Sequence, residues 1–99
     1  MARVVIWSNR AASDIEAIAA YIAEDSEAYA ASVVRTILQK TRRLVEFPFI
    51  GRVVPEFDDE QIREIFAYSY RIIYGVYENE LRIAAIVHGK RLLDISLKP

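Results

Sequence analysis

Apolar residues recur at two different periods along the chain, and the change of period divides the chain into two halves. In the first half, a short β-branched run over residues 3–7 reads as a strand, and apolar side chains then return at helical spacing. The first apolar stripe consists of Ile15, Ile18, Ala19 and Ile22. Ser8 or Asn9 can cap this helix, because both side chains accept a hydrogen bond from a free backbone N–H.

A second helix follows almost directly. The polar run Glu24-Asp25-Ser26 interrupts the first stripe, and Ser26 is a good N-cap with Glu27 in the favourable first turn. The second stripe consists of Ala30, Val34, Ile37, Leu38, Thr41, Leu44 and Val45. Two amphipathic helices joined by so few residues predict an α-hairpin.

The second half of the chain has the pattern of strands. Pro48 and Gly51 mark a turn that ends the helical region. Residues 62–67, 69–77 and 81–88 are then rich in Ile, Val and Tyr, and Asn79 suits a tight hairpin between the last two. The pattern predicts one α+β domain over residues 1–99, ordered β-α-α-β-β-β, with the helical hairpin packed on one face of an antiparallel sheet.

Composition narrows the functional classes. The chain has 99 residues, no cysteine and one histidine, so a thiolate metal site is excluded and a catalytic zinc site is not expected. The three glycines are scattered and form no phosphate-cradling loop. We expect neither cofactor nor metal. No apolar run is long enough for a signal peptide or a membrane span, which favours a cytoplasmic protein that does not bind membranes.

The formal net charge is −1, but the charge is unevenly placed. Residues 26–55 hold five basic side chains against two carboxylates, whereas residues 56–64 hold five carboxylates against Arg63 alone. Nucleic-acid binders usually carry a large basic excess, because phosphate neutralisation supplies much of their affinity. Binding of nucleic acid by this chain would therefore have to rest on a few focused arginines.

One group of residues could carry chemistry. Arg71 opens a predicted strand and the segment from His88 to Arg91 closes the next one, so a hairpin at Asn79 brings both ends together near solvent. Clustered guanidinium groups suit a phosphate or a carboxylate-rich partner.

Two carboxylates upstream and one downstream give these cations a second interpretation. Glu56, Glu64 or Asp94 could pair with them in a surface salt-bridge network that has only a structural role. Both interpretations stay open at this stage.

The order of motifs resembles that of the ParE/RelE toxin superfamily over nearly the whole chain. The matching fragments are Ala12-x-Asp14-Ile15-x-x-Ile18, Phe47-Pro-x-x-Gly-Arg-x-x-Pro-Glu56, Ile62-Arg-Glu64, Tyr70-Arg-Ile-Ile-Tyr74 and His88-Gly-Lys-Arg91. The resemblance implies a helical hairpin on a curved antiparallel sheet. It also implies a growth-inhibiting toxin of a type II toxin–antitoxin system, of the kind associated with plasmid stabilisation, held inactive by a cognate antitoxin protein.

RelE-like members of the superfamily are ribosome-dependent mRNA endoribonucleases. By resemblance, Arg71 and Arg91 would stabilise the phosphate, Glu56 would be the base, and His88 would lie near a functional histidine. The chain departs from this group, since Leu97 replaces a tyrosine that many such nucleases use. Whether the chain is an enzyme therefore depends on which branch it follows.

ParE-like members bind and poison DNA gyrase and lack the nuclease residues. The Gly-Arg-x-x-Pro-Glu, Ile-Arg-Glu and His-Gly-x-Arg fragments are closer to this group, so gyrase inhibition is the favoured interpretation. Arg52, Arg71 and Arg91 are then the candidate target-binding residues. The ribosome with its mRNA is the alternative target, and a degenerate member without a target is the second alternative.

Two tyrosines are candidates for binding the antitoxin. Tyr21 lies well off the first apolar stripe and Tyr29 about a hundred degrees off the second, so neither is expected in the core. Exposed tyrosines are common interface anchors. We expect an amphipathic antitoxin segment on the helical hairpin, with a strand added at the sheet edge as a further possibility.

Overall fold

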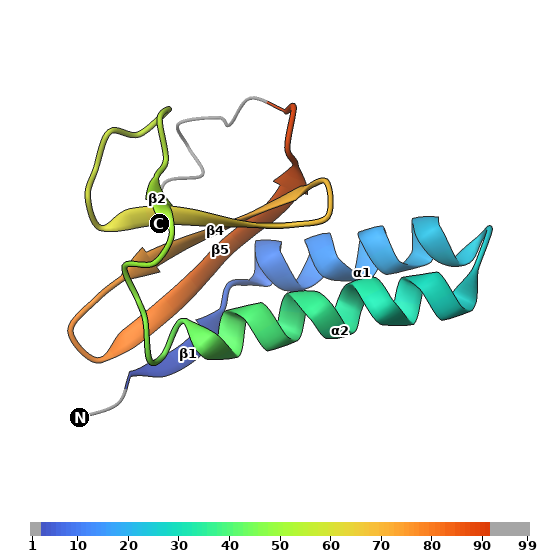
Figure 1. Ribbon diagram of the computed structural model, residues 1–99, viewed down its shortest axis with the longest axis horizontal. Coiled ribbons are helices and arrows are strands. Elements are labelled where there is room, and N and C mark those ends of the chain that lie inside the picture. Colours follow the sequence, from blue (N-terminus) through green and yellow to red (C-terminus); the bar gives the residue numbers. More distant parts are fainter. Residues whose placement is uncertain (1–2, 92–99) are drawn as a thin grey trace.

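The computed structural model describes residues 3–91, which form two helices and one five-stranded sheet (Figure 1). The elements in chain order are β1 (Val4–Trp7), α1 (Asn9–Ala23), α2 (Glu27–Arg43), β2 (Arg52–Val53), β3 (Ile62–Ala67), β4 (Tyr70–Val76) and β5 (Glu80–His88). The predicted α+β class and element order are confirmed, and β2 is an additional two-residue strand that the pattern did not indicate. In the part of the chain that is described, no helix is both long and apolar enough to cross a membrane.

Both helices begin at the serines that the sequence indicates. The Ser8 side chain accepts a hydrogen bond from the backbone N–H of Ala11, and Ser26 does the same for Tyr29. Each cap satisfies one of the N–H groups that the first helical turn leaves without a partner. The Ser8 hydroxyl also donates to the carbonyl of Ala84, which ties the start of α1 to β5.

The sheet has the order β1-β5-β4-β3-β2 and is mixed, which corrects the expectation of a wholly antiparallel sheet. Strands β2 to β5 run antiparallel to their neighbours, but β1 pairs parallel with β5, with Val4 opposite Glu80. The physical reason is topological, because the helical hairpin carries the chain away from β1 and the three later strands return to it from the far edge. β5 therefore lies between the first strand and β4.

The helices cover one face of the sheet, as predicted (Figure 1). On that face the core joins buried residues of both helices to residues of β3, β4 and β5, with Ile37 and Tyr74 fully buried. In α2 the buried position is Val33, whereas the predicted Val34 is only partly buried.

The opposite face of the sheet has a smaller apolar cluster of its own, built from Val54, Ile62, Ile73, Ala85 and Val87. Phe57, in the segment between β2 and β3, packs against this cluster. A register shift in the β4–β5 pairing, between Ile73 and Tyr74, places Ala85 and Val87 on this second face. The register is important for the site below, because Val87 is the residue directly opposite Arg71.

Candidate functional site

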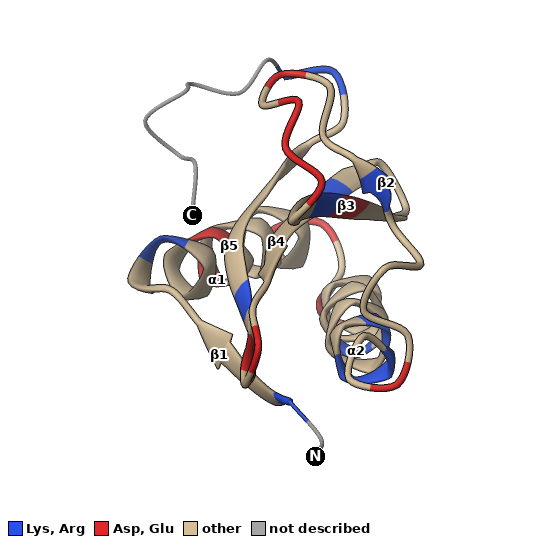
Figure 2. Ribbon diagram, turned by 90° about the vertical axis from the view of Figure 1, so that its left-hand side faces the viewer, with Lys and Arg blue, Asp and Glu red and all other residues tan. Residues whose placement is uncertain are grey.

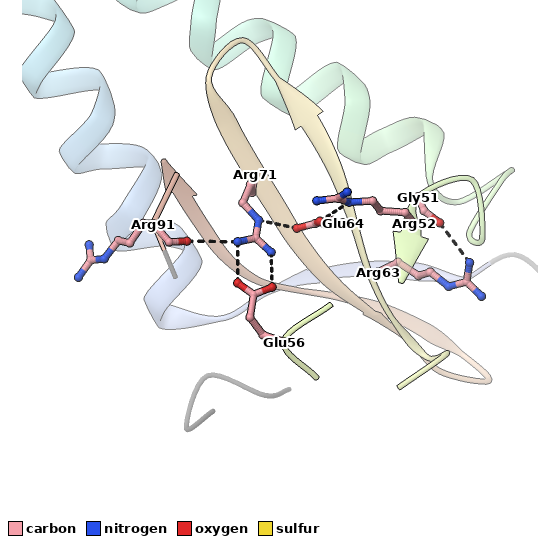
Figure 3. Close-up of polar contacts among 7 residues, drawn as sticks. All are labelled: Gly51, Arg52, Glu56, Arg63, Glu64, Arg71 and Arg91. Carbon is pink, nitrogen blue, oxygen red and sulfur yellow. Dashed lines mark hydrogen bonds and ion pairs between the residues drawn. The ribbon is translucent and has the colours of Figure 1, made fainter. Parts of the chain in front are cut away.

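A chain of alternating charges lies on the face of the sheet away from the helices (Figure 3). It runs from Arg52 on β2 to Glu64 on β3, then to Arg71 on β4 and finally to Glu56 in the segment after β2. The strand register brings these residues together, since Arg52 and Glu64 are direct partners across the β2–β3 pair. Residues far apart in sequence thus meet through ordinary sheet pairing.

Arg71 is the centre of this network and is 4% exposed. Its Nη1 and Nη2 atoms donate to the two carboxylate oxygens of Glu56 at 2.8 and 2.9 Å, and its Nε donates to Glu64 Oε1 at 2.5 Å. A fourth hydrogen bond runs from Nη1 to the backbone carbonyl of Arg91 at 3.2 Å. Four of the five guanidinium donors are therefore used within the protein.

The burial of Arg71 corrects the expectation that this residue lies near solvent. The second apolar cluster lies on the same face of the sheet as Arg71 and includes Ile73, two residues along β4, and Val87, directly opposite on β5. These neighbours help to exclude solvent from the Arg71 side chain. Hydrogen bonds to Glu56 raise the pKa of Arg71 further above its already high ordinary value, so the side chain stays charged. The ion pairs expected with Glu56 and Glu64 are present, although they are largely buried and not at the surface, and Asp94 lies outside the described residues.

Glu64 is fully buried and is held by two arginines. Its Oε2 accepts from Arg52 Nε at 2.5 Å, while its Oε1 accepts from Arg71. A buried carboxylate is stable only where cations and hydrogen bonds compensate its lost hydration. Arg52 remains partly available, because its side chain is 60% exposed and also stacks over the ring of Phe66.

His88 does not converge with this network. It is exposed and pairs across the strands with Tyr70, whose ring meets the imidazole edge-on at a centroid distance of 6.1 Å. Tyr70 packs on the helix-side core, whereas Val87, opposite Arg71, belongs to the other face. Since successive side chains of a strand point to opposite faces, His88 and Arg71 lie on opposite sides of the sheet.

Arg91 is exposed, as expected, and reaches the network only through its backbone carbonyl. Its guanidinium points away from Arg71 and Glu56 (Figure 3). The hairpin thus brings the predicted residues to one end of the sheet but orients their side chains differently. Arg71 points into a buried network, His88 lies on the helix side, and Arg91 projects outward.

A second ordered feature, the turn over residues 47–51, was not among the predicted site residues. The buried Tyr74 hydroxyl accepts a hydrogen bond from Gly51 N at 3.1 Å and donates to the Pro48 carbonyl at 2.8 Å. A Cβ atom on Gly51 would lie 2.5 Å from the Glu64 carbonyl oxygen and 2.6 Å from the Tyr74 hydroxyl, so only glycine fits there. The Pro48-x-x-Gly51 spacing was the feature of the sequence that could have indicated this ordered turn.

The turn presents large apolar side chains to solvent. Phe47, Phe49 and Ile50 are 50%, 51% and 65% exposed. A hollow of about 140 Å³ lies between this turn and the end of α2, where Leu44 and Ile65 form part of its lining. A larger apolar hollow of about 550 Å³ lies between α1 and α2, lined mostly by alanines.

The described residues contain no cluster of three or more histidine or carboxylate side chains placed to hold a metal ion. Every fully buried side-chain nitrogen or oxygen among them has a hydrogen-bond partner. What the geometry offers is therefore a rigid charged network, an exposed arginine beside it, and two apolar surfaces.

Comparison with known proteins identifies a similar solved structure and a matching family. The chain is similar in fold to a chain of a solved structure described as "Chromosomal ParDE TA system from P. aeruginosa", with a TM-score of 0.71 and 20% sequence identity. That alignment covers 87% of this chain and 95% of the other, and no curated protein sequence matches. The family described as "ParE toxin of type II toxin-antitoxin system, parDE" matches residues 5–93. Since that match spans most of the sequence and agrees with the fold, the chain belongs to the ParE toxin family.

Proposed function

We propose that this chain inhibits growth by binding DNA gyrase and that a cognate antitoxin neutralises it. Membership of the ParE toxin family supports the toxin role and an antitoxin partner. The observation that carries the choice of target is the separation of the groups that a nuclease would need. Glu56 is engaged by Arg71 through both carboxylate oxygens, and His88 lies on the other side of the sheet.

Cleavage of RNA by attack of the 2′-hydroxyl needs a base, an acid and cations around one phosphate. A base and an acid must each reach the reacting atoms within hydrogen-bond distance. In this chain the imidazole and the carboxylate are held on opposite sides of a hydrogen-bonded sheet. This geometry favours target binding over acid–base catalysis, and it leaves Arg91 and Arg52 as the exposed cations of the proposed gyrase-binding site.

The target is tested by assaying the purified protein for inhibition of gyrase supercoiling and for cleavage of ribosome-bound mRNA. We expect inhibition without cleavage, and a loss of inhibition in Arg91→Ala. Arg82→Ala is the matched control, since Arg82 is an exposed arginine at the other end of β5. Cleavage of mRNA without an effect on gyrase would establish the ribosome-dependent nuclease, and activity in neither assay would favour the degenerate member.

The double variant Glu56→Gln, His88→Gln separates the same two targets in cells. A nuclease that uses these groups should lose on the order of 10²-fold or more in rate, and toxicity with it. We expect the double variant to remain toxic when expressed without antitoxin, provided that it is soluble. The folded fraction must be measured first, because Glu56→Gln also weakens the contact with Arg71.

For the antitoxin, we propose a helix that lies along the helical hairpin. The apolar hollow between α1 and α2 supports this mode, since Ala20, Ala23 and Ala31 leave room for a partner's larger side chains. Tyr21 is 73% exposed and Tyr29 is 50% exposed, but neither lines this hollow, and helical spacing places both on the outer flanks of the hairpin. The proposed segment therefore has to extend beyond the hollow onto these flanks to contact them. The Tyr29 ring also meets Tyr68 edge-on at 5.9 Å, which fixes its position.

Titration of the antitoxin into Tyr21→Ala and Tyr29→Ala tests this mode. Loss of one anchoring tyrosine should cost about 2 kcal/mol, or roughly thirtyfold in affinity. Arg82→Ala is the control, because Arg82 is exposed and lies between Leu81 and Ile83 of the helix-side core, which places its side chain on the face of the sheet away from the hairpin. Unchanged affinity in both tyrosine variants would exclude the flanks of the hairpin from the interface and leave the edge of the sheet as the better candidate.

A further inference from the structure

The turn between α2 and β2 combines a fixed backbone with apolar side chains that face solvent. The Tyr74 hydroxyl forms hydrogen bonds with the backbone of both Pro48 and Gly51. Within the turn, Ile50 N donates to the Phe47 carbonyl. A loop that served only as a connection would have no need to display large apolar groups in a fixed position. Exposed apolar groups on a preorganised loop are typical of binding surfaces.

Cations surround these apolar side chains. Arg63 lies over the ring of Phe49 at 5.1 Å and donates to the Gly51 carbonyl at 3.2 Å. Lys40 and Arg43, from the end of α2, line the hollow of about 140 Å³ beside Phe47 and Ile50. We call these six residues the turn patch: Lys40, Arg43, Phe47, Phe49, Ile50 and Arg63.

The charge of this region is unbalanced. Residues 40–52 carry four basic side chains against one carboxylate, Glu46. Within residues 3–91, neither Lys40, Arg43 nor Arg63 forms an ion pair. Figure 2 shows basic residues at the end of α2 and along β2 and β3, on the side of the molecule that faces the viewer. An acidic partner would complement this charge.

The hollow indicates what else the partner carries. Its volume is close to that of the cavity of about 150 Å³ that accepts one benzene molecule in another protein. Leu44, Phe47, Ile50 and Ile65 supply apolar walls. One leucine or aromatic side chain is therefore a suitable occupant, with the cations at the rim placed for carboxylates on either side.

We propose that the turn patch binds an acidic protein segment that inserts one large apolar side chain into this hollow. The turn patch shares no residue with the alanine-lined hollow or with the proposed gyrase-binding cations Arg52 and Arg91, although Arg52 directly follows the turn, so the inference goes beyond the proposed function. A nucleic acid fits less well, because Arg63 already occupies one face of the Phe49 ring and leaves less of it for a base to stack on. The net charge of −1 would also supply little of the electrostatic affinity that nucleic acids require.

The test uses defined peptides and the full-length protein. Three capped octapeptides carry Leu, Phe or Trp at the centre of an Asp/Glu sequence, and each is titrated while the backbone amides are followed by NMR. We expect at least one peptide to bind, with the largest shifts at residues 43–51. Affinity should fall at least fivefold in Arg43→Glu and in Ile50→Ser, and also in a peptide whose central residue is Ser.

Arg82→Glu is the matched control, since Arg82 is an exposed cation that belongs neither to the turn patch nor to the lining of the alanine-lined hollow. All variants change exposed side chains, and their unfolding temperatures are measured first so that a folding defect is not read as lost binding. Absence of binding by all three peptides at millimolar concentration would overturn the proposal. So would shifts centred elsewhere, equal weakening by Arg82→Glu, tighter binding of oligothymidine at the same amides, or self-association that Ile50→Ser abolishes.

Discussion

The guanidinium of Arg71 compensates two carboxylates at once, and one of them, Glu64, is fully buried. Such a side chain acts by holding its neighbours in position, since four of its donors are already bound within the protein. It ties β4 to β3 through Glu64 and to the segment after β2 through Glu56. It also holds the chain beyond β5 through the carbonyl of Arg91.

Arg71→Ala should therefore destabilise the protein strongly. Removing one partner of a buried ion pair typically costs about 3–5 kcal/mol, because the other charge is left without compensation. Arg82→Ala, at an arginine whose side chain is 51% exposed, should cost less than about 1 kcal/mol. Urea denaturation of both variants measures the difference, and equal small losses would show that Arg71 is not needed for the fold.

Tyr74 adds a dependence of stability on pH. Burial raises the pKa of Tyr74, whereas the unfolded chain has the ordinary value of about 10. A raised pKa in the folded state means that its contribution is complete below about pH 10 and is lost as the pH rises through the folded value. The loss occurs because the unfolded protein releases this proton more readily than the folded protein.

Tyr74→Phe should lower the free energy of unfolding near neutral pH by about 2 kcal/mol, because Gly51 N and the Pro48 carbonyl lose their shared partner. It should also flatten the decline of stability above pH 10. Tyr21→Phe, at an exposed site, is the control and should change neither quantity. Identical alkaline profiles for wild type and Tyr74→Phe would contradict this assignment.

At the scale of elements, local signals were sufficient to predict the helices and most strands. Ser8 and Ser26 mark helix starts through contacts with residues three positions away, so no knowledge of the rest of the fold was needed. The parallel pairing of β1 with β5 joins residues 76 positions apart, such as Val4 and Glu80, and no local pattern reports it. β2 has only two residues, which is too few for a periodic signal.

The sequence predicted that Arg71, His88 and Arg91 meet at one end of the sheet, but not where their side chains point. The β4–β5 hairpin brings the backbone of Arg71 close to those of His88 and Arg91. The direction of each side chain, however, depends on strand register and on the second apolar cluster. Burial of Arg71 required Glu56 and Glu64 to meet it from two different segments. Such a convergence is a property of the folded chain, and sequence spacing alone does not specify it.

The cap of α2 provides a test at this scale. Ser26→Ala removes the hydroxyl that accepts from Tyr29 N and should cost about 1 kcal/mol. Ser13→Ala is the matched control within α1, since Ser13 is exposed and forms no cap there. That change should be neutral or slightly stabilising, because alanine has the higher helix propensity. A smaller loss for Ser26→Ala than for Ser13→Ala in thermal unfolding would exclude a capping role.

At the scale of the whole molecule, the two apolar clusters share one sheet, and this sheet joins the first strand to the last. Trp7, on β1, packs against the helix-side core and is the only tryptophan of the chain. Its fluorescence therefore reports whether β1 remains attached while the rest unfolds. We expect the transitions seen by fluorescence and by far-ultraviolet circular dichroism to coincide in urea, as in small two-state domains. An earlier fluorescence transition would show that β1 detaches first.

The position of β5 between β1 and β4 has a consequence for synthesis of the chain on the ribosome. β1 and both helices emerge first, but the strand that pairs with β1 occupies residues 80–88 and is translated after all the other described elements. Until then the apolar side of the hairpin has no sheet to cover it. Folding of this domain is therefore completed only after β5 has emerged, and until then the nascent hairpin is open to capture by a chaperone or by another chain.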